Sequence, residues 1–154
     1  MLPQYKIKND PDLICVEFES DKHINALYEL LLLRSHSISH KKNPSKTEHK
    51  RFCLSHPYRY WYLIFKSNEL IGTFCLSKEN AIGIHLLNEY EDYYIVMLKF
   101  ILQTFDPLLP VPSIVPKNFY CNIAPTNLSL IEASKELGGE MCQVAYTFDG
   151  VSNQ

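Results

Sequence analysis

Three runs of β-forming residues follow one another between residues 59 and 87, and they constrain the fold more than any other part of the chain. The runs are Arg59–Lys66 (RYWYLIFK), Glu69–Leu76 (ELIGTFCL) and Ala81–Leu87 (AIGIHLL). Ser67-Asn68 is a turn-like dipeptide between the first two, which predicts a β-hairpin. Gly72 inside the second run predicts a bulge or close backbone packing. Since such short connections join antiparallel neighbours, we expect three antiparallel strands in succession.

Sequence patterns on either side of these runs predict the remaining elements. Before the runs, we expect a strand at Leu13–Phe18, a helix from Ser20 to near Arg34, and a short second helix near Thr47. After them, we expect a buried helix at Asp92–Phe105, an extended loop with four prolines at 106–117, a strand at Phe119–Ile123, a helix at 127–137 and a last strand at Met141–Phe148. The predicted order is β-α-α-β-β-β-α-β-α-β.

This order indicates an α/β (α+β) protein in which helices flank a mixed, mainly antiparallel sheet. The chain has 154 residues, of which 46% are hydrophobic, so it can bury a substantial core. No internal repeat or linker divides it. We therefore expect residues 1–154 to form a single domain.

Composition narrows the classes of function. The formal net charge of −2 argues against a nucleic-acid-binding protein, because such proteins are usually strongly basic. No apolar run reaches the length of a membrane span, and the N-terminus lacks the apolar segment of a signal peptide, so we expect a cytoplasmic protein with no membrane partner. The five cysteines are scattered without close pairs, which predicts reduced thiols.

The segment from Asn127 to Gly138 has the spacing of a known family motif. Asn127 precedes Leu137-Gly138 by the family's interval, and residues 71–76 (IGTFCL) and 82–90 (IGIHLLNEY) resemble the family's third and fourth strands. With the element order, these features resemble the GCN5-related N-acetyltransferase superfamily over nearly the whole chain. The resemblance implies a GNAT-like fold and transfer of an acyl group from acetyl-CoA, or another acyl-CoA, to an amine.

The sequence departs from the family at the loop that holds the coenzyme A diphosphate. That loop normally carries two glycines, which let helix-terminal amides approach the phosphates. Tyr94 and Val96 stand in their places here, and Glu89, Glu91 and Asp92 bring negative charge to the same segment. We therefore expect weakened diphosphate binding, since like charges repel.

The usual acid of the family is also altered. The tyrosine that commonly protonates the departing thiolate is replaced by Ser134, and the Phe that usually follows Gly138 is replaced by Gly139. These two departures leave the motif as support for the fold rather than for the activity.

The resemblance places the candidate site along the third run and the following helix. Cofactor contacts are implied for Leu86, Leu87, Tyr93, Tyr94, Ile95, Asn122 and Asn127. His85 is the candidate base, because imidazole titrates near neutral pH, and Tyr146, or Tyr120, is the candidate acid. Each has a structural alternative: Asn127 is also a good helix N-cap, His85 can be satisfied by hydrogen bonds or face solvent, and strand tyrosines usually pack.

A segment rich in histidines suggests a zinc site, but the spacing of its histidines and cysteine does not match a known zinc-binding motif. His36, His40, His49, Cys53 and His56 lack any tight C-x-x-C or H-E-x-x-H pattern, so no metal is expected. The neighbouring lysines make a solvated basic segment the better interpretation. In the family this region borders the acceptor site, where positive charge suits a phosphorylated or nucleotide-linked acceptor.

Two functions from different classes remain open. The first is an acyl-CoA-dependent N-acyltransferase (acetyltransferase) acting on a small-molecule amine acceptor such as an amino sugar or amino acid. The second is a degenerate GNAT-fold binding or assembly module without CoA chemistry, in which apolar residues of the loop 106–117 dock a partner. A homodimer is compatible with either function.

Overall fold

The computed structural model describes residues 4–38 and 42–150. A six-stranded sheet runs through the molecule in the order β1-β2-β3-β4-β5-β6. The strands are β1 (Gln4–Ile7), β2 (Asp10–Glu17), β3 (Tyr60–Lys66), β4 (Glu69–Leu76), β5 (Ala81–Leu86) and β6 (Tyr120–Cys121). Neighbours are antiparallel except β5 and β6, which are parallel. The predicted mixed, mainly antiparallel sheet is confirmed.

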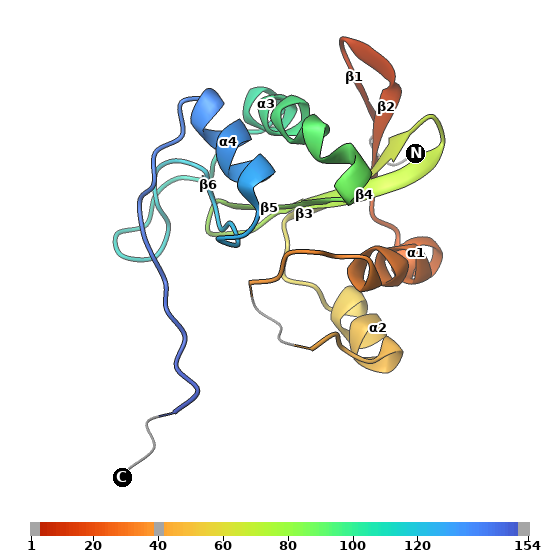
Figure 1. Ribbon diagram of the computed structural model, residues 1–154, viewed down its shortest axis with the longest axis horizontal. Helices are drawn as coiled ribbons and strands as arrows, with labels where there is room; N and C mark the ends of the chain where they lie inside the picture. Colours follow the sequence, from red (N-terminus) through yellow and green to blue (C-terminus); the bar gives the residue numbers. More distant parts are fainter. Residues whose placement is uncertain (1–3, 39–41, 151–154) are drawn as a thin grey trace.

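Helices cover both faces of the sheet (Figure 1). The helices are α1 (Ser20–Leu32), α2 (Lys46–Leu54), the 3₁₀ helix η1 (Asn88–Tyr93), α3 (Tyr94–Thr104) and α4 (Leu128–Glu136). α1 and α2 lie on one face, while α3 and α4 lie on the other. No helix of the described residues is both long and apolar enough to cross a membrane.

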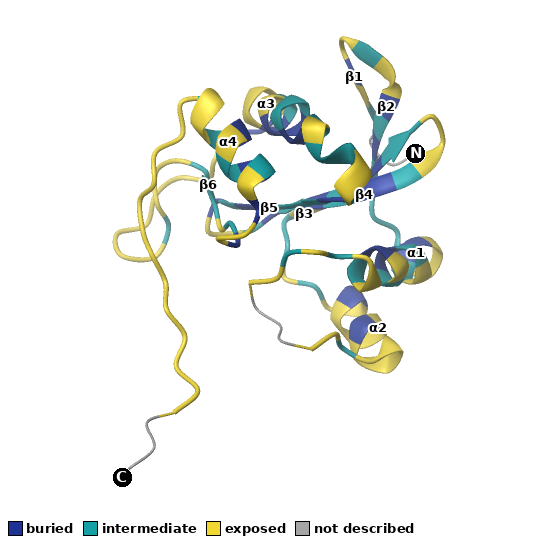
Figure 2. Cartoon of the chain, viewed as in Figure 1, coloured by how far each residue is buried: buried dark blue, intermediate teal, exposed yellow. Residues whose placement is uncertain are grey.

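Two hydrophobic clusters hold these layers together. The larger cluster joins the sheet to α3 and α4 and includes Phe74, Met97, Ile101 and Leu130. The smaller cluster joins the opposite face to α1 and α2 through Leu27, Leu30, Cys53, Trp61 and Leu63. The buried residues in Figure 2 follow the sheet and the inner sides of the helices, as amphipathic elements on a two-sided sheet require.

Gly72 confirms the predicted close packing. The β3–β4 register shifts between Ile64 and Phe65, and Gly72 pairs with Ile64 at this bulge. A Cβ at Gly72 would also collide with the backbone carbonyl of His85 and with the Leu86 side chain. The missing side chain therefore lets β4 and β5 approach where the candidate site begins.

The structure corrects the predicted elements at several ends. β1 was not predicted, because only one of its four residues is buried and its sequence is mostly polar. The segment expected to open a helix at Asp92 is the end of η1, and α3 starts at Tyr94. The strand expected at Phe119–Ile123 shortens to two residues.

The last predicted strand is wrong in this structure. Residues 141–148 form an extended segment that leaves the body of the molecule and pairs with no strand among the described residues (Figure 1).

The preceding helix was predicted correctly: the Asn127 side chain accepts a hydrogen bond from Leu130 N–H, and Gly138 ends the helix with a φ of +85°.

The proline-rich loop is tied to the sheet by Asn80. Its side chain donates to the Leu108 and Pro116 carbonyl oxygens at 2.9 Å each and accepts from Leu108 N–H at 2.6 Å. Asn80 is fully buried, so these bonds are shielded from water. Leu109 and Ile114 between the anchors stay exposed.

Candidate active site

The candidate site lies where β5 and β6 diverge. The two strands pair only at Ala81 with Tyr120 and at Ile82 with Cys121, and the chain then turns away toward α4. On the other side of β5, Leu87 N–H donates to the Ile71 carbonyl. The alternation of an antiparallel ladder consequently directs the N–H groups of Ile84 and Leu86 toward the gap between β5 and β6.

A cavity of about 420 Å³ adjoins this gap. It extends between the sheet and the α1/α2 layer, and this volume suits a small molecule. Its wall is largely apolar and aromatic, with Tyr58, Trp61 and Phe52 on one side and the Asn122–Ala124 segment on the other. The polar groups that line it include Arg34, His36, Thr73, His85, Asn122 and Asn127.

His85 lies on β5 in the wall of this cavity. Burial, the largest cause, and the electrostatic influence of Arg34 and His36 together lower the pKa of the imidazole from 6.5 to about 4, although Glu91 partly opposes them. The ring is therefore neutral at pH 7, with a nitrogen lone pair available to accept a proton. His85 lies on the strand where the sequence predicted it, and its role as a base stays a prediction.

Arg34 is a cavity residue that the sequence interpretation used only to mark the end of a helix. It is partly buried, burial lowers its pKa, and it has no ion-pair partner among the residues that the structure describes. A guanidinium in such a wall is suited to bind a carboxylate or phosphate. Arg34 follows the buried Leu27 and Leu30 of α1 by seven and four residues, and this helical spacing was the available sequence signal.

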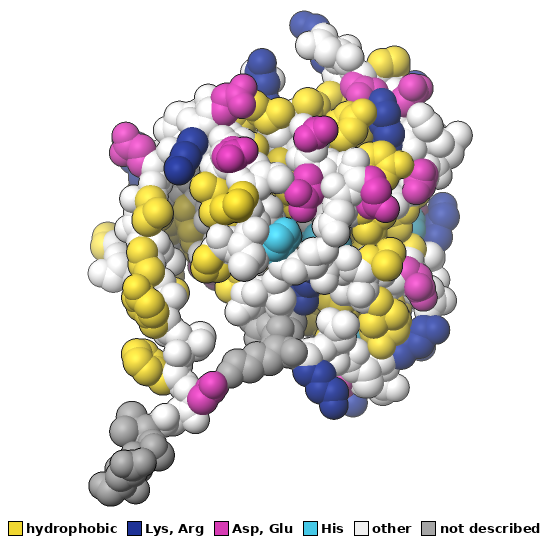
Figure 3. All heavy atoms as spheres, viewed as in Figure 1, with side chains coloured by type: hydrophobic (Ala, Val, Ile, Leu, Met, Phe, Trp, Pro, Cys, Tyr) yellow, Lys and Arg dark blue, Asp and Glu magenta, His cyan; other side chains and the backbone are white. Residues whose placement is uncertain are grey.

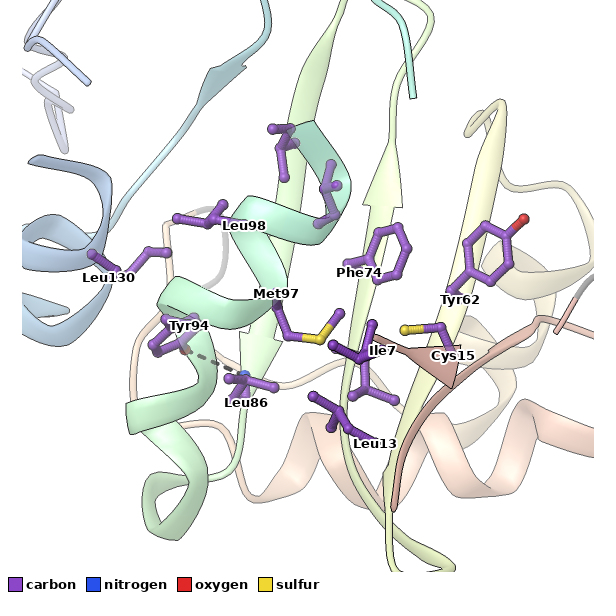
Figure 4. Close-up of a cluster of buried hydrophobic side chains, with 14 of the residues drawn as sticks. Ile7, Leu13, Cys15, Tyr62, Phe74, Leu86, Tyr94, Met97, Leu98 and Leu130 are labelled. Atoms are coloured by element: carbon purple, nitrogen blue, oxygen red, sulfur yellow. Dashed lines mark hydrogen bonds between the residues drawn. The ribbon is translucent and has the colours of Figure 1, made fainter. Parts of the chain in front are cut away.

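Tyr94 fills part of the gap beside β5. Its hydroxyl accepts from Leu86 N–H at 3.3 Å and from Asn127 Nδ2 at 3.4 Å, and the side chain is 1% exposed. Figure 4 shows Tyr94 on α3 reaching to Leu86, with the hydrogen bond dashed. Tyr94 therefore joins β5, α3 and α4, and it satisfies the Leu86 amide that the resemblance assigned to the cofactor.

The N-terminal end of α3 does not form a phosphate-binding loop. η1 runs directly into α3, and Tyr94 N–H donates to the Glu91 carbonyl, so this amide is already bonded. The Glu91 carboxylate lies 3.4 Å from His36 Nε2 and accepts from Ser129 Oγ at 2.7 Å. Its negative charge thus occupies the region where a diphosphate would need free donors.

Other predicted cofactor residues lie away from the cavity. Leu87 packs in the α1/α2 cluster, and Ile95 packs against the α3/α4 cluster. Tyr93 places its ring 5.4 Å from Lys66 Nζ. The structure brings Asn122 and Asn127 to the cavity with His85 and leaves these three residues outside it.

Tyr146 is not at the cavity. It belongs to the extended segment after α4 and is 81% exposed, because the strand expected to carry it inward does not form. Tyr120, on β6, is partly buried and does not line the cavity.

The histidines that suggested zinc are engaged in other contacts. His49 Nε2 lies 3.0 Å from the Ile24 carbonyl and 3.4 Å from Cys53 Sγ, and His56 packs against Tyr58 and Trp61. No cluster of three or more potential ligands occurs in the described ranges, and His40 lies outside them.

An acyl-CoA fits one end of this site and not the other. At the strand end, the diverging pair and the Ile84 amide match the needs of an acyl thioester. At the helix end, the joined η1–α3 segment, the Glu91 carboxylate and the Tyr94 side chain do not fit a diphosphate and its arm in the family's manner.

No sequence-family model matches the chain, and no curated protein matches it in sequence. Solved structures match it in fold. An acetyltransferase from Salmonella typhimurium that modifies the N-terminal serine of the 50S ribosomal subunit protein L7/L12 is 17% identical, with a TM-score of 0.59, over 84% of this chain and 81% of that chain. The RimL ribosomal L7/L12 alpha-N-protein acetyltransferase in complex with coenzyme A is 15% identical, with a TM-score of 0.58, over 86% and 82%.

A third match is an integron cassette protein from the mobile metagenome of V. cholerae. It is 10% identical, with a TM-score of 0.57, over 90% of this chain and 93% of that chain. At such identities the likeness concerns the fold, and it agrees with the strand order, the parallel β5–β6 pair and the motif from Asn127 to Gly138. The chain has the fold of the GCN5-related N-acetyltransferases.

Proposed function

We propose that the chain is an N-acyltransferase that acylates a small amine carrying an anionic group. The observation that carries this proposal is the neutral His85 in the wall of a cavity that reaches the divergence of β5 and β6. An acyl-CoA is the donor that the fold implies, and acetyl-CoA is the first to test. The amine would enter from the α1/α2 side of the cavity.

His85 would act as the proton acceptor. An amine is mostly an ammonium at pH 7, and it must lose a proton before it can attack an acyl carbon. The neutral ring can take that proton directly or through one water. With a pKa of about 4 the ring is a weak base, so the bound acceptor has to raise its basicity.

Arg34 supplies a physical route to that increase. Its positive charge is one cause of the low pKa of His85. An anionic group of the acceptor, bound to Arg34, would offset this charge and move the pKa of His85 back toward 6.5. Binding of the correct acceptor would then prepare the base, which favours amino acids and phosphorylated amino sugars over uncharged amines.

Thermal unfolding and turnover test this proposal together. Acetyl-CoA at millimolar concentration should raise the Tm, because a ligand of the native state stabilises it. His85→Gln should keep the fold and lower turnover by about 10²-fold, the usual contribution of a general base. The control is Lys78→Gln, an exposed change in the turn before β5, which should leave both unchanged.

A binding module without CoA chemistry is the second candidate, and Tyr94 and Glu91 favour it. Their side chains occupy the gap and the phosphate region through internal hydrogen bonds. If this candidate is correct, acetyl-CoA will not shift the Tm, whereas anionic amines will still do so through Arg34. Those two results together would contradict the proposed acyltransferase activity, and they would show that the cavity binds anionic amines.

A further inference from the structure

The segment 141–148 has the composition of a strand but lacks a partner strand. Its even-numbered residues, Cys142, Val144, Tyr146 and Phe148, are apolar, and the residues between them are Gln143, Ala145 and Thr147. Such alternation is typical of a strand with one covered face. Val144, Tyr146 and Phe148 are instead 66%, 81% and 85% exposed. Figure 3 shows hydrophobic side chains succeeding one another along this segment.

β6 has an outer edge that pairs with no strand of the described sheet. It ends the sheet, pairs with β5 on one side, and extends over only two of the five strand-forming residues 119–123. Phe119, Cys121 and Ile123 alternate along residues 119–123 and pack against the α3/α4 cluster. A strand added to the outer edge of β6 would lengthen this pairing and continue the same apolar face.

Local structure after α4 directs the segment away from its own β6. Gly138 has a φ of +85°, its N–H donates to the Lys135 carbonyl, and Gly139 N–H donates to the Ser134 carbonyl at 2.8 Å. A Cβ on Gly139 would lie 2.7 Å from that carbonyl oxygen, so the close approach requires glycine. The direction in which the chain leaves α4 is thus fixed by hydrogen bonds, and it leads outward (Figure 1).

We propose that residues 141–148 of one copy add a strand to the outer edge of β6 in a second copy of this chain. Each copy offers one such segment and one such edge, so two copies satisfy each other in a closed, two-fold symmetric dimer. Eight extended residues span about 26 Å, more than enough to cover residues 119–123. The side chains of Cys142, Val144, Tyr146 and Phe148 would leave water in the process, which supplies the driving force.

Light scattering on the full chain during size exclusion tests this directly. We expect a mass twice the 17.9 kDa of one chain. Tyr146→Asp, on the apolar face, should raise the dimer dissociation constant by about tenfold or more, because it would place a charge in the covered face. Thr147→Asp, on the opposite face, is the matched control and should change it by less than about twofold.

Other outcomes overturn the proposal. A monomeric full chain whose Tm falls in Tyr146→Asp would mean that the segment covers its own molecule. Equal effects of Tyr146→Asp and Thr147→Asp would mean association without strand pairing. Circular dichroism of both variants checks that the fold is retained, which we expect because both positions are exposed in the single chain.

Discussion

At the scale of the residue, His85 combines burial with nearby positive charge. Its pKa in the folded chain, about 4, lies below the usual 6.5, so the unfolded chain binds a proton first as the pH falls. Because of this group, the free energy of unfolding rises with pH between about 4 and 6.5 and no longer changes above that range. Arg34 supplies such a charge and was not recognised from the sequence as part of the site, whereas His36 belongs to the segment that was expected to border the acceptor site.

This linkage gives a pH-dependent prediction. His85→Gln removes the titrating group, so the variant should lose less stability than the wild-type chain between pH 7 and pH 4.5, by on the order of 2 kcal/mol. Denaturant unfolding at both pH values measures the difference. The pKa values of His23 and His56 are also lowered by burial, but these residues are present in both proteins and cancel. An equal loss in both chains would show that His85 titrates normally.

Tyr94 gives a second prediction at this scale. Tyr94→Phe leaves Leu86 N–H and Asn127 Nδ2 without the acceptor that the hydroxyl provides, which should cost about 1–3 kcal/mol. Tyr60→Phe is the matched control, since Tyr60 is 38% exposed, and it should stay within about 0.5 kcal/mol of wild type. Equal unfolding free energies for the two variants would contradict the role of Tyr94 as a buried link.

At the scale of the element, sequence and structure agree where local chemistry decides. The 67–68 turn, the β3–β4 hairpin and α4 between Asn127 and Gly138 each carry their own start and stop signals. β1 lacked such a signal, because its pairing with β2 rather than its own pattern makes it a strand. The sequence of residues 141–148 predicted a strand that does not form, because no partner strand lies beside it among the residues that the structure describes. Local patterns do not contain that information.

The two glycines of these elements should respond differently to alanine. Gly138→Ala meets no atom within 4 Å and should cost only the left-handed backbone, about 1–2 kcal/mol. Gly72→Ala adds a methyl group that collides with the backbone of β5, and it should destabilise the chain by more than about 3 kcal/mol. Thermal and denaturant unfolding rank the two variants. A smaller effect at Gly72 would mean that β4 and β5 separate easily.

At the scale of the whole molecule, one sheet divides two environments. α3 and α4 close the larger core on one face, while α1 and α2 leave the cavity on the other. The fold class and the position of His85 could be predicted from strand order and from one spaced motif. The hydrogen bonds that occupy the N-terminal end of α3 could not be predicted. They depend on the contacts of Tyr94 with β5 and of Glu91 with α4, which local sequence does not specify.

The most direct measurement is the release of coenzyme A thiol from acetyl-CoA in the presence of a panel of small amines. We predict release that depends on both protein and amine, that is fastest for amines with a carboxylate or phosphate, and that falls by about 10²-fold in His85→Gln. Arg34→Met should remove the preference for anionic amines while leaving slow turnover of uncharged ones. Release that no amine accelerates, with wild-type protein equal to His85→Gln, would contradict the proposed N-acyltransferase.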